Sequence, residues 1–393
     1  MAETGPEQPA YWAGVVSLAL GVFGLVTAEF LPASLLTPIA KDLGVSLGAA
    51  GQSMTMTAVV GAIAGPGVVI ATRSFDRRLV LFGLTATLVL SSLLAATAGG
   101  LVQLFLARAL LGIGLGGFWA MSLALAMRLV PGRLMPRAMA IVMSGVSAAT
   151  VCAAPIGAYV GDLLGWRAAF AIAAVLGLAA LLLQILTLPA MPPKGSASLA
   201  TMAAVLRRPS IRLGLLTVLL VVSGHFAGFT FIRPFLETGP QMSVGGISAT
   251  LLAFGVGGFL GNLVGGVLAE RNTPRAIIFS SGGIAAMALV LTLAGSSVAL
   301  VAIATALWGF FFGALPVSVQ SFVTKAAGDE AESAGAMMLT TFQIAICSGA
   351  IFGGLIVNTQ GPAGVFAFTT LGTLLGAATI AFGSRRRLVP SEG

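Results

Sequence analysis

The sequence predicts an all-α membrane protein with twelve transmembrane helices, arranged as two pseudo-symmetric halves of six. Of its 393 residues, 58% are hydrophobic and only 8% are charged, against roughly 25% charged residues in a soluble domain. Long apolar runs recur along the chain, and features of the first six runs return in the last six. A transmembrane β-barrel is excluded, because its strands alternate weakly over short segments.

Each predicted span is an apolar run of about 20 residues, the length that crosses the hydrocarbon core of a bilayer. The predicted spans are 12–36, 48–71, 79–99, 101–127, 138–160, 167–188, 212–236, 244–268, 276–295, 297–321, 335–357 and 362–383. The first residues, MAETGPEQPAYW, are acidic and polar and contain no basic segment. We therefore expect no cleaved signal peptide.

The basic residues predict how the spans are oriented. Most of the 20 Lys and Arg fall on the side of the membrane where the chain starts: Arg73, Arg77, Arg78, Arg128, Arg133, Arg137, Lys194, Arg207, Arg208, Arg212, Arg271, Arg275, Lys325 and Arg385 to Arg387. The other side holds Lys41, Arg167 and Arg233. Because basic loops remain in the cytoplasm, we expect both termini there. This placement accounts for the net charge of +8, and we expect no nucleic-acid partner.

The longest break in the apolar pattern is a segment that contains Pro, Ser and Arg between the sixth and seventh spans. It predicts an N-terminal six-helix half (1–188), a cytoplasmic linker (189–211) and a C-terminal six-helix half (212–393). The halves match at several positions: Gly157, Gly165 and Phe170 with Gly353, Gly361 and Phe366, and Cys152 with Cys347. Duplicated helical units that enclose a site near the midplane are typical of secondary transporters.

Charged side chains inside spans are costly, so they are candidates for function. Glu29 is the carboxylate that lies well inside a span, Arg108 lies in the fourth span and His225 in the seventh. Apolar surroundings favour the protonated form of a carboxylate, which suits Glu29 to bind and release a proton. Arg108 stays charged and needs a partner, for which Glu29 is the first candidate. His225 can titrate or donate to a ligand.

Each of these residues also has a structural interpretation. Glu29 could cap a polar contact at the outer interface, Glu29 and Arg108 could form a purely structural ion pair, and His225 could hydrogen-bond a neighbouring helix. Along the fourth span, Arg108, Gly112 and Trp119 share one helical face. Trp119 could stack on a planar ligand or pack against another helix.

Neutral polar residues in other spans favour an uncharged, hydrogen-bonding solute over an ion. Gln52 lies in the second span, and Gln320 and Gln343 lie in the second half. We find no catalytic constellation, no paired intramembrane carboxylates and no phosphate-binding glycine loop, so we do not expect an enzyme. Two cysteines and one histidine provide no pattern for a disulfide or a metal site, and we expect no cofactor.

A loop motif resembles that of the major facilitator superfamily. The second-half segment 266–271 is similar to the cytoplasmic loop motif of that superfamily. The first-half copy departs from it, because Thr72 stands where an acidic residue is usual, which weakens the case for an acid–base latch there. The residues of both copies that carry the resemblance are Arg73, Arg77, Arg78, Glu270 and Arg271.

Motifs inside the spans narrow the resemblance to the drug–proton antiporter branch, which contains sugar and nucleoside efflux proteins. Arg108 with Leu111 and Gly112 resembles the fourth-span motif of proton-coupled members. Pro155 and Gly157 resemble a degraded fifth-span antiporter motif, which implies efflux rather than uptake. Further matching stretches are 29–38, 41–44, 50–53, 111–131 and 232–234.

The resemblance implies a major facilitator fold and a proton-coupled antiporter of the bacterial inner membrane. It implies export of purine ribonucleosides such as inosine and guanosine, with arabinose-like sugars or drugs as the alternative. By analogy, Glu29 carries the proton and Arg108 is its switch partner. The expected substrate-binding residues are Gln52, Phe118, Trp119, His225, Trp308, Gln320 and Gln343. We expect a monomer whose partners are a small neutral solute, protons and the lipid bilayer.

Overall fold

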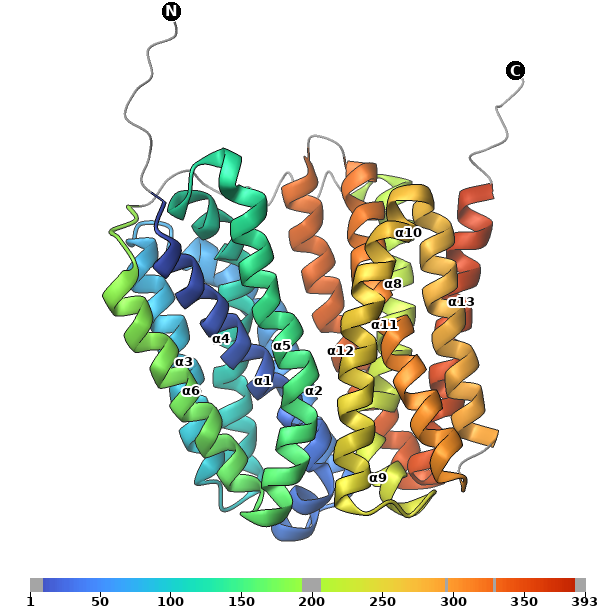
Figure 1. Cartoon of the computed structure of the whole chain (residues 1–393). Coiled ribbons are helices and arrows are strands. Elements are labelled where there is room, and N and C mark those ends of the chain that lie inside the picture. The colour runs from blue at the N-terminus through green and yellow to red at the C-terminus, as the bar shows by residue number, and fades with distance from the viewer. Residues whose placement is uncertain (1–9, 193–205, 294–295, 328–329, 386–393) are drawn as a thin grey trace, which may run out of the picture.

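The computed structural model describes residues 10–192, 206–293, 296–327 and 330–385, and within these ranges the regular structure is helical (Figure 1). Two helical bundles lie side by side. The first holds α1 (Trp12–Leu43), α2 (Leu47–Ala71), α3 (Arg77–Ala96), α4 (Leu101–Leu129), α5 (Met135–Leu163) and α6 (Trp166–Thr187). The second holds α8 (Pro209–Thr230), α9 (Ile232–Thr238), α10 (Val244–Leu293), α11 (Val298–Ala327), α12 (Ala331–Gln360) and α13 (Val365–Arg385). The predicted fold class is confirmed.

The two ends of the molecule along the helix axes can be told apart by the helices that begin or end there. α1 begins and α13 ends at the same end, which we call the termini end (Figure 1). The other end, where α9 lies, is called the distal end. Of the basic residues that predict the orientation, Lys194, Arg386 and Arg387 lie outside the described residues.

α10 combines two of the predicted spans. Eleven helices among the described residues are long and apolar enough to cross a membrane, one fewer than predicted. The 50 residues of α10 would extend about 75 Å as one straight helix, more than twice the hydrocarbon core of about 30 Å. Asn272 leaves the helical conformation with φ −157° and ψ 96°, and the chain reverses its direction there (Figure 1). α10 thus contains the eighth predicted span and the ninth as far as Leu293.

Other predicted spans also have different ends in the structure, among them the seventh and the first. The seventh, 212–236, is divided between α8 and α9, because Phe231 leaves the helical conformation with φ −109° and ψ 17°. The first continues past the predicted end at 36, and α1 ends at Leu43. The following Gly44 has φ 63°, a left-handed conformation that terminates helices at little cost for glycine.

The two bundles repeat the same local structure at the positions that match in sequence. Gly165 begins α6 with φ 82° and ψ 154°, and Gly361 precedes the last helix with φ 76° and ψ 176°. Only glycine adopts these backbone angles readily. Gly157 of α5 packs against α1, and Gly353 of α12 packs against α8, so equivalent helices meet at equivalent glycines.

Glycines also let helices of one bundle approach each other closely. Gly112 and Gly116 of α4 face the backbone of Gly61 in α2. In the second bundle, Gly257 and Gly261 of α10 face the backbone of α11. A side chain at any of these positions would meet backbone atoms, which cannot rotate away as a side chain can.

Substitution of Gly261 by alanine is expected to destabilise the protein by about 1–3 kcal/mol. The added Cβ would overlap the carbonyl oxygen of Phe310 and force α10 and α11 apart. Gly282 lies in the same helix, and no described atom lies within 4 Å of the place that a Cβ would occupy there. Gly282→Ala is therefore the matched control. Thermal unfolding in detergent measures the effect, and equal midpoints for the two variants would contradict the close approach.

Candidate functional site

Arg108 binds three backbone carbonyls from deep inside the first bundle. Its side chain is 1% exposed. Nη1 donates to the carbonyl of Ala28 at 2.7 Å and Nη2 donates to that of Glu29 at 3.1 Å. Nε donates to the carbonyl of Ser53 at 3.4 Å, and Thr57 of α2 donates to the carbonyl of Arg108 itself at 3.2 Å. The arginine therefore joins α4 to both α1 and α2.

The Glu29 carboxyl group is buried near this arginine without pairing with it. Glu29 is 8% exposed. Among the described residues, the ion pairs join Arg167 to Asp42 and Arg233 to Glu237, and the expected Glu29–Arg108 ion pair is not formed in this conformation. The guanidinium binds the backbone carbonyl of Glu29 instead. Glu29 thus lies close to a buried positive charge with its carboxyl group free to change protonation state.

An aromatic cluster lies in the second bundle, where the residue after Glu29 reaches it from the first. His225 lies parallel to Phe312, with ring centroids 3.4 Å apart, and contacts Trp308 edge-on at 5.2 Å. Phe30, which follows Glu29 in α1, contacts the cluster from the first bundle. The aromatic cluster consists of Phe30, His225, Phe226, Phe229, Phe254, Trp308 and Phe312.

Three buried polar atoms in and beside the aromatic cluster have no hydrogen-bond partner among the described residues. They are Nδ1 of His225, Nε1 of Trp308 and Oγ1 of Thr305. All three side chains are at most 1% exposed, and a buried polar group without a partner is costly. Thr305 and Trp308 lie one helical turn apart on α11, on the same face. The cluster therefore offers flat apolar surfaces together with hydrogen-bonding atoms that a ligand could satisfy.

The other expected binding residues lie away from this cluster. Phe118 is fully buried inside the first bundle against Gly21, and Trp119 is half-buried on α4. Gln52 donates to the carbonyl of Ala350 at 3.3 Å, across the contact between α2 and α12. Gln343 is buried in that same contact, with its amide against Gly61.

Gln320 lies nearer the termini end than the aromatic cluster. It is exposed and donates to Thr324 at 3.3 Å. On α11 it follows Phe312 by eight residues, about 12 Å along the helix axis. The structure thus brings His225 and Trp308 together and leaves the three glutamines elsewhere.

The first-half loop motif has Thr72 where an acidic residue is usual, and this threonine still holds the loop together. Arg77 donates to both the carbonyl and the hydroxyl of Thr72, each at 3.2 Å. Asp76 accepts from the backbone N–H groups of Arg78 and Met191, which ties the start of α3 to the chain that leaves α6. Arg73 is exposed.

The second-half loop motif is anchored by a lysine. Lys325 of α11 donates to the carbonyl of Ala269 at 3.2 Å and to Thr273 at 2.9 Å, on either side of the bend in α10. Glu270 and Arg271, between these two positions, are exposed. The lysine therefore fixes the turn that separates the two arms of α10.

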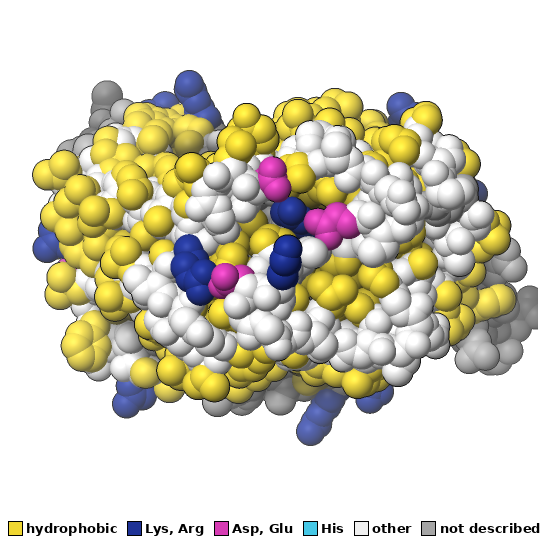
Figure 2. Space-filling model, turned by 90° about the horizontal axis from the view of Figure 1, so that it is seen from below, with side chains coloured by type: hydrophobic (Ala, Val, Ile, Leu, Met, Phe, Trp, Pro, Cys, Tyr) yellow, Lys and Arg dark blue, Asp and Glu magenta, His cyan; other side chains and the backbone are white. Residues whose placement is uncertain are grey.

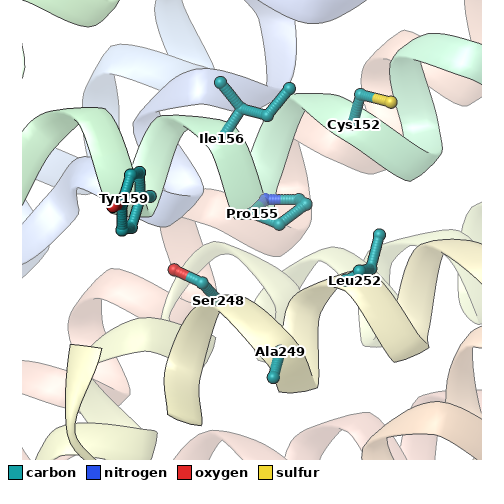
Figure 3. Close-up of a pocket in the computed structure, with 7 residues that line it drawn as sticks. All are labelled: Cys152, Pro155, Ile156, Tyr159, Ser248, Ala249 and Leu252. Carbon is teal, nitrogen blue, oxygen red and sulfur yellow. The ribbon is translucent and has the colours of Figure 1, made fainter. Parts of the chain in front are cut away.

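The fifth-span motif lies where α5 meets both α1 and α10. A Cβ at Gly157 would lie 2.6 Å from the hydroxyl oxygen of Ser34. Pro155 lines an apolar groove between α5 and α10 (Figure 3), into which Ser248 and Leu252 point from α10. A similar groove between α2 and α12 includes Val59, Ile63, Ile344 and Cys347. These grooves mark the two long contacts between the bundles.

Hydrogen bonds between the bundles gather at the distal end. Arg233 donates to the carbonyl of Ser34 at 2.6 Å and pairs with Glu237 at 2.7 Å. Glu237 accepts from Thr37 at 2.5 Å. Figure 2 shows acidic and basic side chains near the middle of this otherwise largely uncharged end. The bundles are therefore held together on the distal side of Glu29 and the aromatic cluster.

Two bundles that enclose polar groups near their midplane can expose them to each side in turn, which is how secondary transporters work. The fold and the site thus define a multi-span membrane transporter. The chain belongs to the Major Facilitator Superfamily, whose sequence model matches residues 18–350. The resemblance seen in the loop and span motifs is confirmed.

The chain is similar to curated proteins over nearly its whole length. It is 38% identical to the Transcription regulatory protein OpdE of Pseudomonas aeruginosa, over 99% of this chain and 98% of that one. It is also 38% identical to the Purine ribonucleoside efflux pump NepI of Shigella sonnei, over 93% of this chain and 91% of that one. The pump of the same name from Escherichia coli K12 is 38% identical, over 89% and 88% of the two chains.

Solved structures show the same fold. A bacterial homolog of the human lysosomal transporter Spinster, in an inward-facing and occupied conformation, matches with a TM-score of 0.75 at 16% identity, over 99% of this chain and 100% of that one. Its inward-facing and unoccupied conformation matches with a TM-score of 0.70, also at 16% identity, over 97% and 96% of the chains. At this identity the likeness concerns the fold.

The sequence did not single out most of the aromatic cluster. Phe229 follows His225 by four residues and Phe312 follows Trp308 by four, a spacing that places each pair on one helical face. That spacing could have pointed to a cluster. It was obscured because the chain contains 23 phenylalanines, most of which serve equally well in packing or in contact with lipid.

Proposed function

We propose that the protein is a proton-coupled antiporter that exports purine ribonucleosides, such as inosine and guanosine, across the bacterial inner membrane. The observation that carries the proposal is a buried, unpaired carboxyl group beside an aromatic cluster with unsatisfied polar atoms. The similarity to pumps that are named for purine ribonucleoside efflux supports it. Both termini face the cytoplasm in this proposal, and the distal end faces the periplasm.

Glu29 carries the proton. In the described conformation Arg108 binds carbonyls and makes no ion pair with the Glu29 carboxylate, an arrangement that suits a protonated, neutral Glu29. Loss of the proton would create a buried negative charge, which would attract the guanidinium. A shift of Arg108 between the carbonyls and the carboxylate would move α4 against α1. Proton binding is thereby linked to helix position.

The purine base binds at the aromatic cluster. A flat heterocycle gains from stacking on Phe or His rings, and its edge nitrogens and oxygens suit His225 Nδ1 and Trp308 Nε1, which the described part of the chain leaves without a partner. Gln52, Trp119, Gln320 and Gln343 lie away from the cluster in this conformation, and we assign them no contact with a base bound there. Phe118 supports the packing of α1. No charged group on the solute is required.

The two halves, 1–188 and 212–393, rock about this site while 189–211 links them. A neutral solute exchanged for one proton draws on about 2.3 kcal/mol per 100 mV. That free energy sustains a solute gradient of roughly 50-fold per 100 mV. A monomer is sufficient, because the site is built from one chain.

Uptake of labelled inosine by inside-out vesicles, acidified inside, tests the proposal. The protein should accumulate inosine, and an uncoupler should collapse the accumulation. No inosine transport by folded protein would reject the purine assignment. Competition by arabinose or by unrelated drugs would instead favour the alternative, a sugar or multidrug exporter of the same fold.

Replacing His225 by phenylalanine is expected to raise the KM for inosine about tenfold with little change in maximal rate. The variant keeps a ring for stacking but loses the nitrogen that would hydrogen-bond the base, a loss of about 1–1.5 kcal/mol. Exchange of labelled for unlabelled inosine at equal pH measures KM without the proton step. An unchanged KM would remove His225 from the substrate site, and lost proton dependence at normal KM would make it a coupling residue.

A further inference from the structure

Two prolines in α1 each leave one backbone carbonyl without its helical partner. In an α-helix, each N–H donates to the carbonyl four residues earlier, and proline has no N–H to donate. Pro32 and Pro38 both lie inside α1. Pro32 therefore frees the carbonyl of Ala28, and Pro38 frees the carbonyl of Ser34.

Each freed carbonyl accepts a hydrogen bond from a buried arginine. Arg108 donates to the carbonyl of Ala28 at 2.7 Å, and Arg233 donates to the carbonyl of Ser34 at 2.6 Å. The exposed fractions of the two arginines are 1% and 4%. A buried carbonyl without a partner is costly, and a charged donor is a strong one. The prolines thus create the two places on α1 to which arginines bind.

The two arginines differ in the helices that they join. Arg108 belongs to α4, so its bond to α1 lies within the first bundle and can persist while the bundles move. Arg233 belongs to α9 of the second bundle, so its bond to α1 must break when the bundles separate at the distal end. The bond from Thr37 to Glu237 crosses the same contact.

We infer that Pro38 is a positioning residue for transport, and that it provides Arg233 with the carbonyl that closes the distal end. Breaking the hydrogen bond from Arg233 to the Ser34 carbonyl costs little free energy, for two reasons. Arg233 keeps its ion pair with Glu237, four residues along the same helix, so the guanidinium is not left uncompensated. Water that enters as the distal end opens can bind the Ser34 carbonyl. This inference concerns the gate and does not depend on the identity of the solute.

The test is labelling of a single reporter cysteine by a membrane-impermeant maleimide added on the distal side. Cys152 and Cys347 are first replaced by serine, and Phe30, which contacts the second bundle, is replaced by cysteine. In this background Arg233→Gln should increase the labelling rate about tenfold, because a charge-assisted hydrogen bond is lost. Labelling from the termini side should fall. Arg233→Lys, with a single donor group, should give an intermediate rate.

Pro38→Ala should increase the labelling rate about two- to fivefold, because the restored N–H competes with Arg233 for the Ser34 carbonyl. The matched control is Arg167→Gln. It breaks an ion pair at the distal end that joins α1 to α6 within the first bundle, and it should leave the rate unchanged.

Three results would overturn the inference. An unchanged rate in Arg233→Gln would remove the arginine from the gate, and an equal increase in Arg167→Gln would indicate general loosening. An increase in Arg233→Gln without one in Pro38→Ala would remove the proline from its positioning role. If Arg233→Gln does not fold, Arg233→Lys carries the same comparison. The labelling is measured without solute. A negative labelling result is therefore distinct from a failure of the protein to transport inosine.

Discussion

Replacing Glu29 by glutamine is expected to abolish proton-driven accumulation of inosine, a loss of at least about 100-fold. Glutamine has nearly the size of a protonated glutamate but cannot release a proton. The variant should therefore still exchange labelled for unlabelled inosine at equal pH, while a pH gradient no longer drives net transport. Inside-out vesicles acidified inside measure both activities in the same preparation.

Asp162→Asn is the matched control for this variant. Asp162 is an exposed carboxylate near the distal end of α5, so its loss should leave accumulation intact. Accumulation that survives in Glu29→Gln would move the proton site elsewhere, with His225 as the next candidate. Loss of exchange together with accumulation would give Glu29 a role in the structure or in solute binding instead.

Replacing Arg108 by glutamine is expected to lower both transport and stability. The variant removes the donor to the carbonyl of Ala28, which has no helical partner because residue 32 is proline, whereas the carbonyls of Glu29 and Ser53 lie inside helices and can keep their helical N–H donors. A buried unpaired carbonyl costs about 1–3 kcal/mol, and that of Ala28 should remain unpaired. We expect transport to fall about 10- to 100-fold in both accumulation and exchange, with a lower midpoint of thermal unfolding.

Loss of both activities in Arg108→Gln contrasts with the selective loss expected for Glu29→Gln. Arg108→Lys should recover part of the stability, because lysine can donate to the nearest carbonyl. Arg167→Gln serves for comparison, because it removes an arginine that is 38% exposed. The surface ion pair of Arg167 with Asp42 contributes at most about 1 kcal/mol. Normal coupling and normal thermal stability in Arg108→Gln would contradict the role of Arg108 in joining the three helices.

The fold could be predicted from sequence because a bilayer restricts a chain to few structures. Apolar runs of about 20 residues form helices there, since each backbone group must find a partner within the segment. The turn between the eighth and ninth spans could be located in the same way, because the apolar pattern breaks between 268 and 276 and the bend at Asn272 falls in that break. The division of the seventh span at Phe231 was missed, because the apolar pattern continues through it, although Pro234 has no N–H for the carbonyl of Thr230 and is a local signal for the break.

The charged residues of the site could be predicted from the sequence, but the contacts that they make could not. Glu29, Arg108 and His225 stand out because charge is rare inside a span. That Arg108 binds carbonyls rather than Glu29 depends on which helices pack side by side, which the sequence does not specify. The prolines in α1 were visible as residues, but the carbonyls that they free gain a role only where an arginine from another helix reaches them.

The grooves between α5 and α10 and between α2 and α12 give the surrounding lipid a part in the energetics. Their linings are apolar and include half-exposed residues such as Ile156 and Tyr159, so acyl chains fill them in a bilayer. The proposed rocking of the bundles would reshape both grooves and therefore repack those chains. The height of the barrier between the two states thus depends on acyl-chain length and unsaturation, and the turnover rate becomes a property of the protein and its membrane together.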